Sequence, residues 1–115
     1  MEIITGRCHC GKVRYEAKGP IIRSSICECS GCQRATGTFN APFVTVSEDG
    51  FKLLNEVPKS FTAEQGDRCD AYGSWYFCPH CGTHVYWKSK IDGEIDLFAG
   101  TLDDTSFFQI EKKDK

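Results

Sequence analysis

Short stretches in which apolar and polar side chains alternate recur along most of this chain. Residues 12–18 alternate strictly, with Val13, Tyr15 and Ala17 as the apolar members, and a period of two predicts a half-buried strand. Comparable runs are separated by turns rich in glycine, proline and aspartate. One helical turn is expected over residues 33–36, stopped by Gly37. The predicted strands cover residues 12–18, 21–26, 41–46, 51–54, 59–63, 68–77, 83–88 and 95–99.

Many short strands without a helix of ordinary length predict an all-β fold built from short antiparallel sheets. A length of 115 residues predicts a single domain spanning residues 1–115, in which the charged residues 110–115 form a flexible, solvated tail. A chain of this size buries a limited fraction of its surface and gains much from a metal that staples it.

The composition indicates which kinds of partner and which cellular compartment to expect. The net charge of -2 and the isoelectric point of about 5.9 offer no basic footprint for a nucleic acid. No apolar segment is long enough to span a bilayer, and the first residues lack the pattern of an export signal. We therefore expect a cytoplasmic protein that contacts neither nucleic acid nor membrane.

Eight cysteines in a reducing compartment favour metal ligation over disulfides, although their even number also suits a disulfide framework. The segment around Cys78 and Cys81 has the spacing of a metal-binding knuckle, in which Gly82 takes a positive φ and amides point at the sulfurs. Cys8 and Cys10 are the obvious partners for this pair. Four thiolates around Zn²⁺ make a closed site of the structural kind.

The remaining group, Cys27, Cys29 and Cys32, places three sulfurs within reach of one metal. A second zinc held by three protein ligands keeps an open position, which is the pattern of a catalytic site. The alternative is that a fourth ligand closes this site too, and the candidates are Cys69, Glu28 or a histidine. Glu28 is also a candidate general base, whereas Cys69, on the strand predicted over residues 68–77, is most simply a packed thiol.

The three histidines lie near cysteines without being needed as ligands. His9 and His80 sit between ligands and are expected to point outward, and His84 is expected to be an ordinary strand residue.

Taken together, the segments Cys8-His9-Cys10-Gly11, Cys27-Glu28-Cys29-Ser30-Gly31-Cys32 and Cys78-Pro79-His80-Cys81-Gly82 resemble the glutathione-dependent formaldehyde-activating enzyme family, which includes the centromere protein V domain. The resemblance extends from Arg7 to about Phe108 and implies an Mss4-like β fold. It also implies a structural zinc on Cys8, Cys10, Cys78 and Cys81 and a second zinc on Cys27, Cys29 and Cys32. Glu28 replaces the family's usual histidine and adds negative charge beside the second metal.

The resemblance implies that a small thiol such as glutathione adds to a small aldehyde such as formaldehyde, formally a carbon–sulfur lyase run backwards. In that hypothesis Cys27, Cys29, Cys32 and Glu28 form the catalytic group. The alternative function is a non-catalytic zinc module that binds a protein or senses metal.

Overall fold

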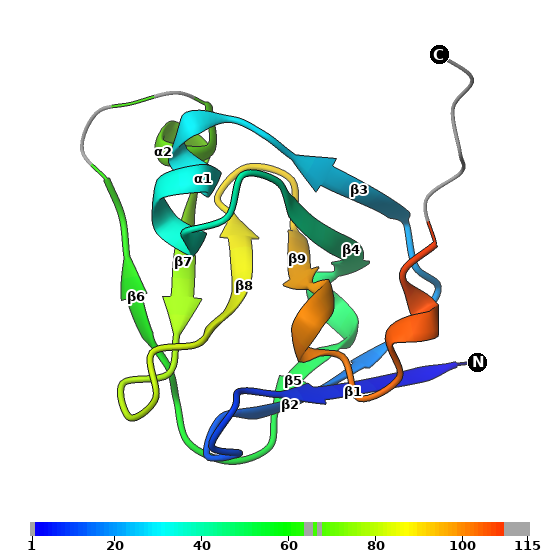
Figure 1. Cartoon of the computed structure of the whole chain (residues 1–115). Coiled ribbons are helices and arrows are strands. Elements are labelled where there is room, and N and C mark those ends of the chain that lie inside the picture. Colours follow the sequence, from blue (N-terminus) through cyan, green and yellow to red (C-terminus); the bar gives the residue numbers. More distant parts are fainter. Residues whose placement is uncertain (1, 64–65, 67, 110–115) are drawn as a thin grey trace.

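The computed structural model describes residues 2–63, 66 and 68–109 of the chain (Figure 1). Within this part, nine strands form two antiparallel sheets, a smaller one with the order β1-β2-β5 and a larger one with the order β3-β4-β9-β8-β7-β6. The strands are β1 (Ile3–Arg7), β2 (Arg14–Lys18), β3 (Arg23–Cys27), β4 (Ala41–Ser47), β5 (Phe51–Leu53), β6 (Lys59–Phe61), β7 (Gly73–Phe77), β8 (His84–Ser89) and β9 (Glu94–Phe98). The predicted class, an all-β fold of short antiparallel sheets, is confirmed.

The helical elements are short. They are α1 (Ser30–Thr36), α2 (Arg68–Tyr72) and the 3-10 turns η1 (Glu48–Gly50), η2 (Ala99–Thr101) and η3 (Thr105–Phe107). The helix expected over residues 33–36 begins three residues earlier than predicted. It ends as predicted at Gly37, which has φ 76° and donates its N–H to the Gln33 carbonyl at 2.8 Å.

The strand predicted over residues 68–77 is wrong in its first half. Residues 68–72 form α2, and extended structure begins at Gly73, where pairing with Ser89 of β8 starts. Tertiary packing decides this boundary, since a Cβ at Gly73 would overlap the Trp87 ring and lie 2.6 Å from the Lys88 carbonyl oxygen. The indole Nε1 of Trp87 also donates to the Cys69 carbonyl at 3.1 Å, which holds α2 against β8.

Two faces of the larger sheet have different surroundings because successive side chains on a strand point to opposite sides. On β9, Ile95 and Leu97 are fully buried in the core shared with the smaller sheet. Glu94 and Asp96 alternate with them and therefore face the other side, where α1 and α2 lie (Figure 1). This second face carries the site described below.

The remaining expectations concern the chain's ends and membranes. The tail expected over residues 110–115 lies outside the described residues. No helix in the described part of the chain combines the length and apolar character needed to cross a membrane.

Candidate metal centres and adjoining pocket

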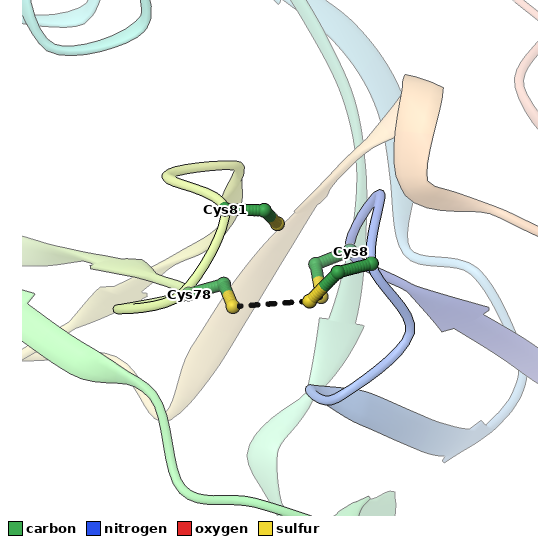
Figure 2. A group of neighbouring side chains, drawn as sticks. Cys8, Cys78 and Cys81 are labelled. Carbon is green, nitrogen blue, oxygen red and sulfur yellow. Dashed lines mark hydrogen bonds between the residues drawn. The ribbon is translucent and has the colours of Figure 1, made fainter.

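The first cysteine cluster joins the two sheets. Cys8 and Cys10 follow β1 of the smaller sheet, whereas Cys78 and Cys81 lie in the turn between β7 and β8 of the larger sheet. Figure 2 shows the sulfurs of Cys78 and Cys81 directed toward Cys8 on the opposite loop. The Cys10 Sγ lies 3.6 Å from the Cys8 Sγ and 3.7 Å from the Cys78 Sγ.

The loop of Cys78 and Cys81 has the expected knuckle geometry, and the loop of Cys8 and Cys10 has a similar one. Gly82 has φ 81° and Gly11 has φ 84°, conformations that favour glycine. Amides point at the sulfurs, since the N–H of His80 donates to the Cys78 Sγ at 3.3 Å and that of Val13 donates to the Cys8 Sγ at 3.4 Å. The features of the turn over residues 78–82 confirm the local geometry that its spacing predicted.

The histidines stay outside both clusters, as expected. His9 is exposed, and the ring Nε2 of His80 lies 2.7 Å from a Glu56 carboxylate oxygen. His84 is half-buried on β8, with its ring 5.6 Å from that of Phe77. Burial lowers the pKa of His84, which favours its neutral form.

The second cluster gathers the three predicted cysteines and adds Cys69. Cys27 ends β3, Cys29 is the residue before α1, and Cys32 lies in the first turn of α1. Cys69 reaches them from α2, so that its sulfur lies 3.5 Å from the Cys27 Sγ and accepts from the Cys32 thiol at 3.4 Å. The Cys27 and Cys29 sulfurs are 3.1 Å apart. Of the alternatives left open by the sequence, the structure therefore favours Cys69 as a fourth donor.

Both clusters fit a tetrahedral metal ion. In each, the four sulfurs lie within 4.8 Å of one another. Zinc–sulfur bonds of about 2.3 Å in a tetrahedron separate the sulfurs by roughly 3.8 Å. The closest sulfur–sulfur distances in the two clusters, 3.1 to 3.7 Å, are slightly shorter than this. The observed sulfur–sulfur distances are much longer than a disulfide bond of about 2.05 Å, and all eight cysteines are free thiols. The donor sets therefore suit zinc at both places, and the disulfide alternative is not supported.

Individual thiols differ in acidity, and the first cluster contains shifts of both signs, since the pKa of Cys10 is raised to about 11 although the Lys12 amide favours its thiolate. Burial raises the pKa of Cys29 to about 12, and the hydrogen bond with Cys69, together with burial, raises the pKa of Cys32. In the first cluster, hydrogen bonds from Thr83 lower the pKa of Cys81 to about 5. Because a metal binds thiolates, its uptake by the second cluster must release protons.

The second cluster forms part of the wall of a cavity of about 550 Å³. All four of its sulfur-bearing residues line this cavity. The rest of the wall includes Trp87 and Tyr72, together with charged side chains from β3, β9 and the turn before β9. The charged lining residues are Arg23, Glu28, Asp92, Glu94 and Asp96.

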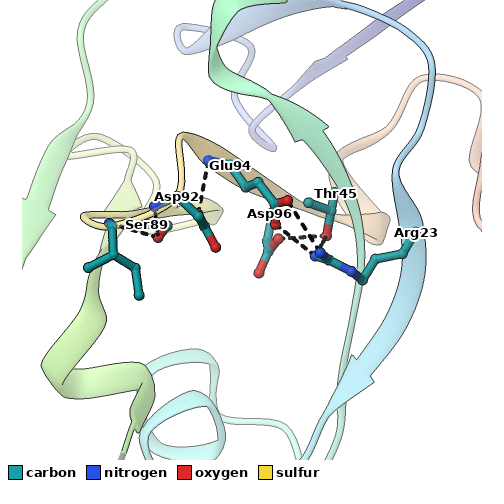
Figure 3. Close-up of polar contacts among 7 residues, drawn as sticks. Arg23, Thr45, Ser89, Asp92, Glu94 and Asp96 are labelled. Carbon is teal, nitrogen blue, oxygen red and sulfur yellow. Dashed lines mark hydrogen bonds and ion pairs between the residues drawn. The ribbon is translucent and has the colours of Figure 1, made fainter.

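Strand register explains why distant residues meet in this cavity. Arg23 pairs with Thr45, Thr45 with Asp96, and Asp96 with Trp87, so these four residues are lateral neighbours across four strands. Arg23 donates to the two Glu94 carboxylate oxygens at 2.9 and 3.3 Å (Figure 3). The Thr45 hydroxyl accepts from Arg23 at 3.2 Å and donates to Asp96 at 2.7 Å.

Asp96 is the perturbed acid of this network. Desolvation raises its pKa to about 6, even though the Thr45 hydrogen bond and Arg23 favour the charged form. The negative charges of Glu94 and Asp92 act in the same direction as desolvation. A carboxyl group whose pKa is raised by burial therefore lies in the same cavity as the sulfurs.

Sequence analysis missed the charged wall of this cavity. The available signal was the alternation of Glu94 and Asp96 with Ile95 and Leu97, which indicates a strand whose second face is polar. What that face meets depends on sheet order and on the placement of α1 and α2.

A second cavity, of about 710 Å³, lies beside the first cluster and touches it through Cys8. Its described lining includes Arg7, Asp103, His9 and His84. The sulfurs of Cys10, Cys78 and Cys81 do not line it, so this cavity is not built around a cysteine cluster.

Fold and clusters together define a class: a small β protein with two four-cysteine groups suited to zinc, one joining the sheets and one beside a pocket. The chain belongs to the glutathione-dependent formaldehyde-activating enzyme family, because the model of that family matches residues 3–113. This confirms the resemblance seen in the cysteine segments.

Comparison with solved structures found a crystal structure of a Rhodobacter sphaeroides protein with a TM-score of 0.66 and 23% sequence identity. The match covers 86% of this chain and 87% of that one, and it shows a shared fold. A search of curated proteins gave no match.

Proposed function

We propose that this protein joins a small thiol to a small aldehyde at the second cysteine cluster, a reaction of the carbon–sulfur lyase class run toward addition. The observation that carries the proposal is the cavity of about 550 Å³ whose wall contains Cys27, Cys29, Cys32 and Cys69. Membership of a family described as glutathione-dependent and formaldehyde-activating supports it. Glutathione and formaldehyde are the substrates that the family description suggests.

Zinc held by these cysteines would supply a thiol in its thiolate form at neutral pH and hold it in position. The protein's own part is to make room for that thiol. Cys27, Cys29 and Cys32 come from one segment of six residues, whereas Cys69 comes from α2, so Cys69 is the ligand that the incoming sulfur replaces.

Atoms balance in this addition without an oxidant or a reductant. A bond forms between the thiol sulfur and the carbonyl carbon, and the π electrons of the carbonyl move to its oxygen. The proton that leaves the thiol ends on that oxygen. Glu28 lines the cavity next to two of the ligands and is exposed, and we assign it the transfer of this proton. Cys27, Cys29 and Cys32 hold the reacting centre.

One observation favours the second candidate, a non-catalytic zinc module. Cys69 gives the second cluster four sulfurs, and zinc sites with four protein ligands are of the closed, structural kind. The two candidates differ in whether the Cys69 sulfur exchanges with an external thiol.

Titration of the zinc-loaded protein with small thiols, with metal content measured alongside, separates these candidates. The enzyme hypothesis predicts saturable thiol binding with both zinc ions retained, and turnover with formaldehyde that Cys29→Ser abolishes in a folded protein. Two tightly held zinc ions with no response to any thiol would establish the closed module instead.

The eight free thiols also support a reducing compartment, and we assign the protein to the cytoplasm. A cytoplasmic location is tested by fractionation of cells that express the tagged chain.

A further inference from the structure

The cavity beside the second cluster carries an excess of negative charge. Its described lining residues contain the carboxylates of Glu28, Asp92, Glu94 and Asp96 but only one cationic side chain, Arg23. With every carboxyl ionised, the described lining has a formal charge of -3. A zinc ion bound by four thiolates adds about -2.

Arg23 is already engaged and does not offset this charge for a ligand. Its guanidinium donates to both carboxylate oxygens of Glu94, and one of its nitrogens also donates to the Thr45 hydroxyl (Figure 3). An incoming carboxylate would have to break this bidentate pair to obtain a charged partner among the described lining residues.

Three lining carboxyl groups, those of Glu28, Asp92 and Asp96, have no cationic hydrogen-bond partner in the described part of this wall, and two of them, Asp92 and Asp96, lie close in sequence on β9 and the turn before it. Asp92 is exposed, and its Oδ1 accepts the backbone N–H of Glu94 at 3.1 Å. Asp96 accepts from the neutral Thr45 hydroxyl. Both therefore keep acceptor capacity that an ammonium group in the cavity can use.

We propose that this cavity selects small thiols with a positive charge or none, above all an aminothiol whose ammonium group meets Asp92 and Asp96, and that it disfavours anionic thiols. The inference rests on the proposed function, because it assigns the substrate class of the same site. Glutathione carries two carboxylates and one ammonium group, so this charged wall makes it a poorer substrate than an aminothiol.

The first experiment measures the potential of the cavity and does not require catalysis. The zinc-loaded protein is treated with a cationic trimethylammonium methanethiosulfonate and an anionic sulfonate analogue of similar size, and peptide mass spectrometry follows modification of Cys27, Cys29, Cys32 and Cys69. The measured quantity is the ratio of the modification rate by the cationic reagent to that by the anionic reagent. We expect this ratio to be roughly tenfold or more higher for the cluster cysteines than for free 2-mercaptoethanol at low salt. An unchanged or inverted ratio would overturn the inference and leave the proposed function standing.

The second experiment measures affinity for cysteamine, 2-mercaptoethanol, 3-mercaptopropionate and glutathione by calorimetry of the zinc-loaded protein. We expect affinity to fall in the order cationic, neutral, anionic, with a difference that shrinks as salt is raised. Tighter binding of 3-mercaptopropionate than of cysteamine would refute the charge selection. A charge-biased cavity that binds none of the four thiols would overturn the proposed function and its substrate class together.

Variants that remove one charge each test whether the cavity's carboxylates cause the preference for the cationic reagent. Asp92→Asn keeps the acceptor for the Glu94 amide and removes one charge, so we expect the cation preference to fall roughly threefold. Arg23→Gln leaves Glu94 unpaired, and the preference should rise. Glu16→Gln makes the same change of charge on β2 of the other sheet and should leave the preference unaltered. Equal effects of Asp92→Asn and Glu16→Gln would contradict the assignment to this cavity.

Discussion

Cys69 differs from the other cysteines of its cluster because it reaches the site from a separate element. It lies 42 positions from Cys27 in sequence, and its backbone carbonyl is fixed by the Trp87 indole. Its sulfur nevertheless approaches those of Cys27 and Cys32 as closely as sulfurs approach around a shared zinc. Whether this side chain stays or exchanges decides between a closed and a reactive metal site.

Replacing Cys69 by serine should open the second site without unfolding the protein. If the Cys69 sulfur occupies the fourth position most of the time, its removal raises the apparent affinity for 2-mercaptoethanol roughly tenfold or more. Calorimetry measures the affinity, and metal analysis must still find two zinc ions. Weaker thiol binding with both zinc ions present would show that Cys69 does not compete for the position.

Asp96 should make stability depend on pH in a defined direction. Its pKa is raised in the folded protein from an ordinary value of 3.8 to about 6, so its contribution to stability is fully present below pH 3.8 and is lost as the pH rises through 6. Arg23, Glu94, Asp92 and Thr45 act on it from β3, β9, the preceding turn and β4. Between pH 5 and pH 7.5, we expect the free energy of unfolding of the wild type to fall by about 1 kcal/mol relative to that of Asp96→Asn.

Denaturant unfolding of both proteins at several pH values measures this difference. Both keep all eight cysteines, so the pH dependence of the metal sites cancels. Parallel stability curves would show that Asp96 does not titrate in this range.

At the scale of elements, the junction of α2 and β7 shows how packing overrides local sequence. The aromatic residues Trp75, Tyr76 and Phe77 continue the strand as predicted, whereas residues 68–72 coil and bring Cys69 to the second cluster. Gly73 is the point of change, because Trp87 of β8 crosses directly over it.

Gly73→Ala should therefore destabilise the protein by about 1–3 kcal/mol, since the added Cβ overlaps the Trp87 ring. Displacement of Trp87 also weakens its hydrogen bond to the Cys69 carbonyl, so the second zinc should be lost more readily to a chelator. Gly100→Ala is the control, because nothing lies within 4 Å of the added Cβ, and we expect a change below about 0.5 kcal/mol. Equal destabilisation by the two substitutions, measured by chemical denaturation, would contradict this account.

At the scale of the whole molecule, the two clusters connect different parts of the fold. The first joins the smaller sheet to the larger one through buried Cys8 and Cys78. The second joins the end of β3 to α2 and packs beside a smaller cluster of buried residues that includes Trp75 and Phe98. A metal in the first cluster would therefore hold the two sheets together. A metal in the second cluster would support only one face of the larger sheet.

Graded chelation should release zinc in two steps with different consequences. The first equivalent, from the second cluster, should leave the near-ultraviolet circular dichroism largely intact. Loss of the second equivalent should unfold the chain, because a structural zinc contributes about 10–16 kcal/mol of binding free energy and domain stability is about 5–15 kcal/mol. Cys78→Ser removes a ligand of the first cluster, so this variant should be unfolded without any chelator. Loss of structure in proportion to zinc across both steps would show that the clusters are not divided in this way.

Local sequence was enough to predict a large part of the fold and of the clusters. The alternation of apolar and polar residues predicted most of the strands, and the spacing of Cys8 with Cys10 and of Cys78 with Cys81 predicted sulfurs held side by side. These features depend on neighbours within a few residues, where backbone geometry is set by the residues themselves. The start of β7 at Gly73 could not be predicted in this way, because the Trp87 ring that limits it belongs to another strand.

By itself, the sequence determined the membership of a family, the class of fold and the likeness of three cysteine segments to metal ligands. Tertiary structure alone decided that Cys69 completes the second group and that Arg23, Glu94 and Asp96 share its cavity. The physical reason is that these residues come from α2, β3 and β9, and only strand register and sheet order place such distant side chains on one face.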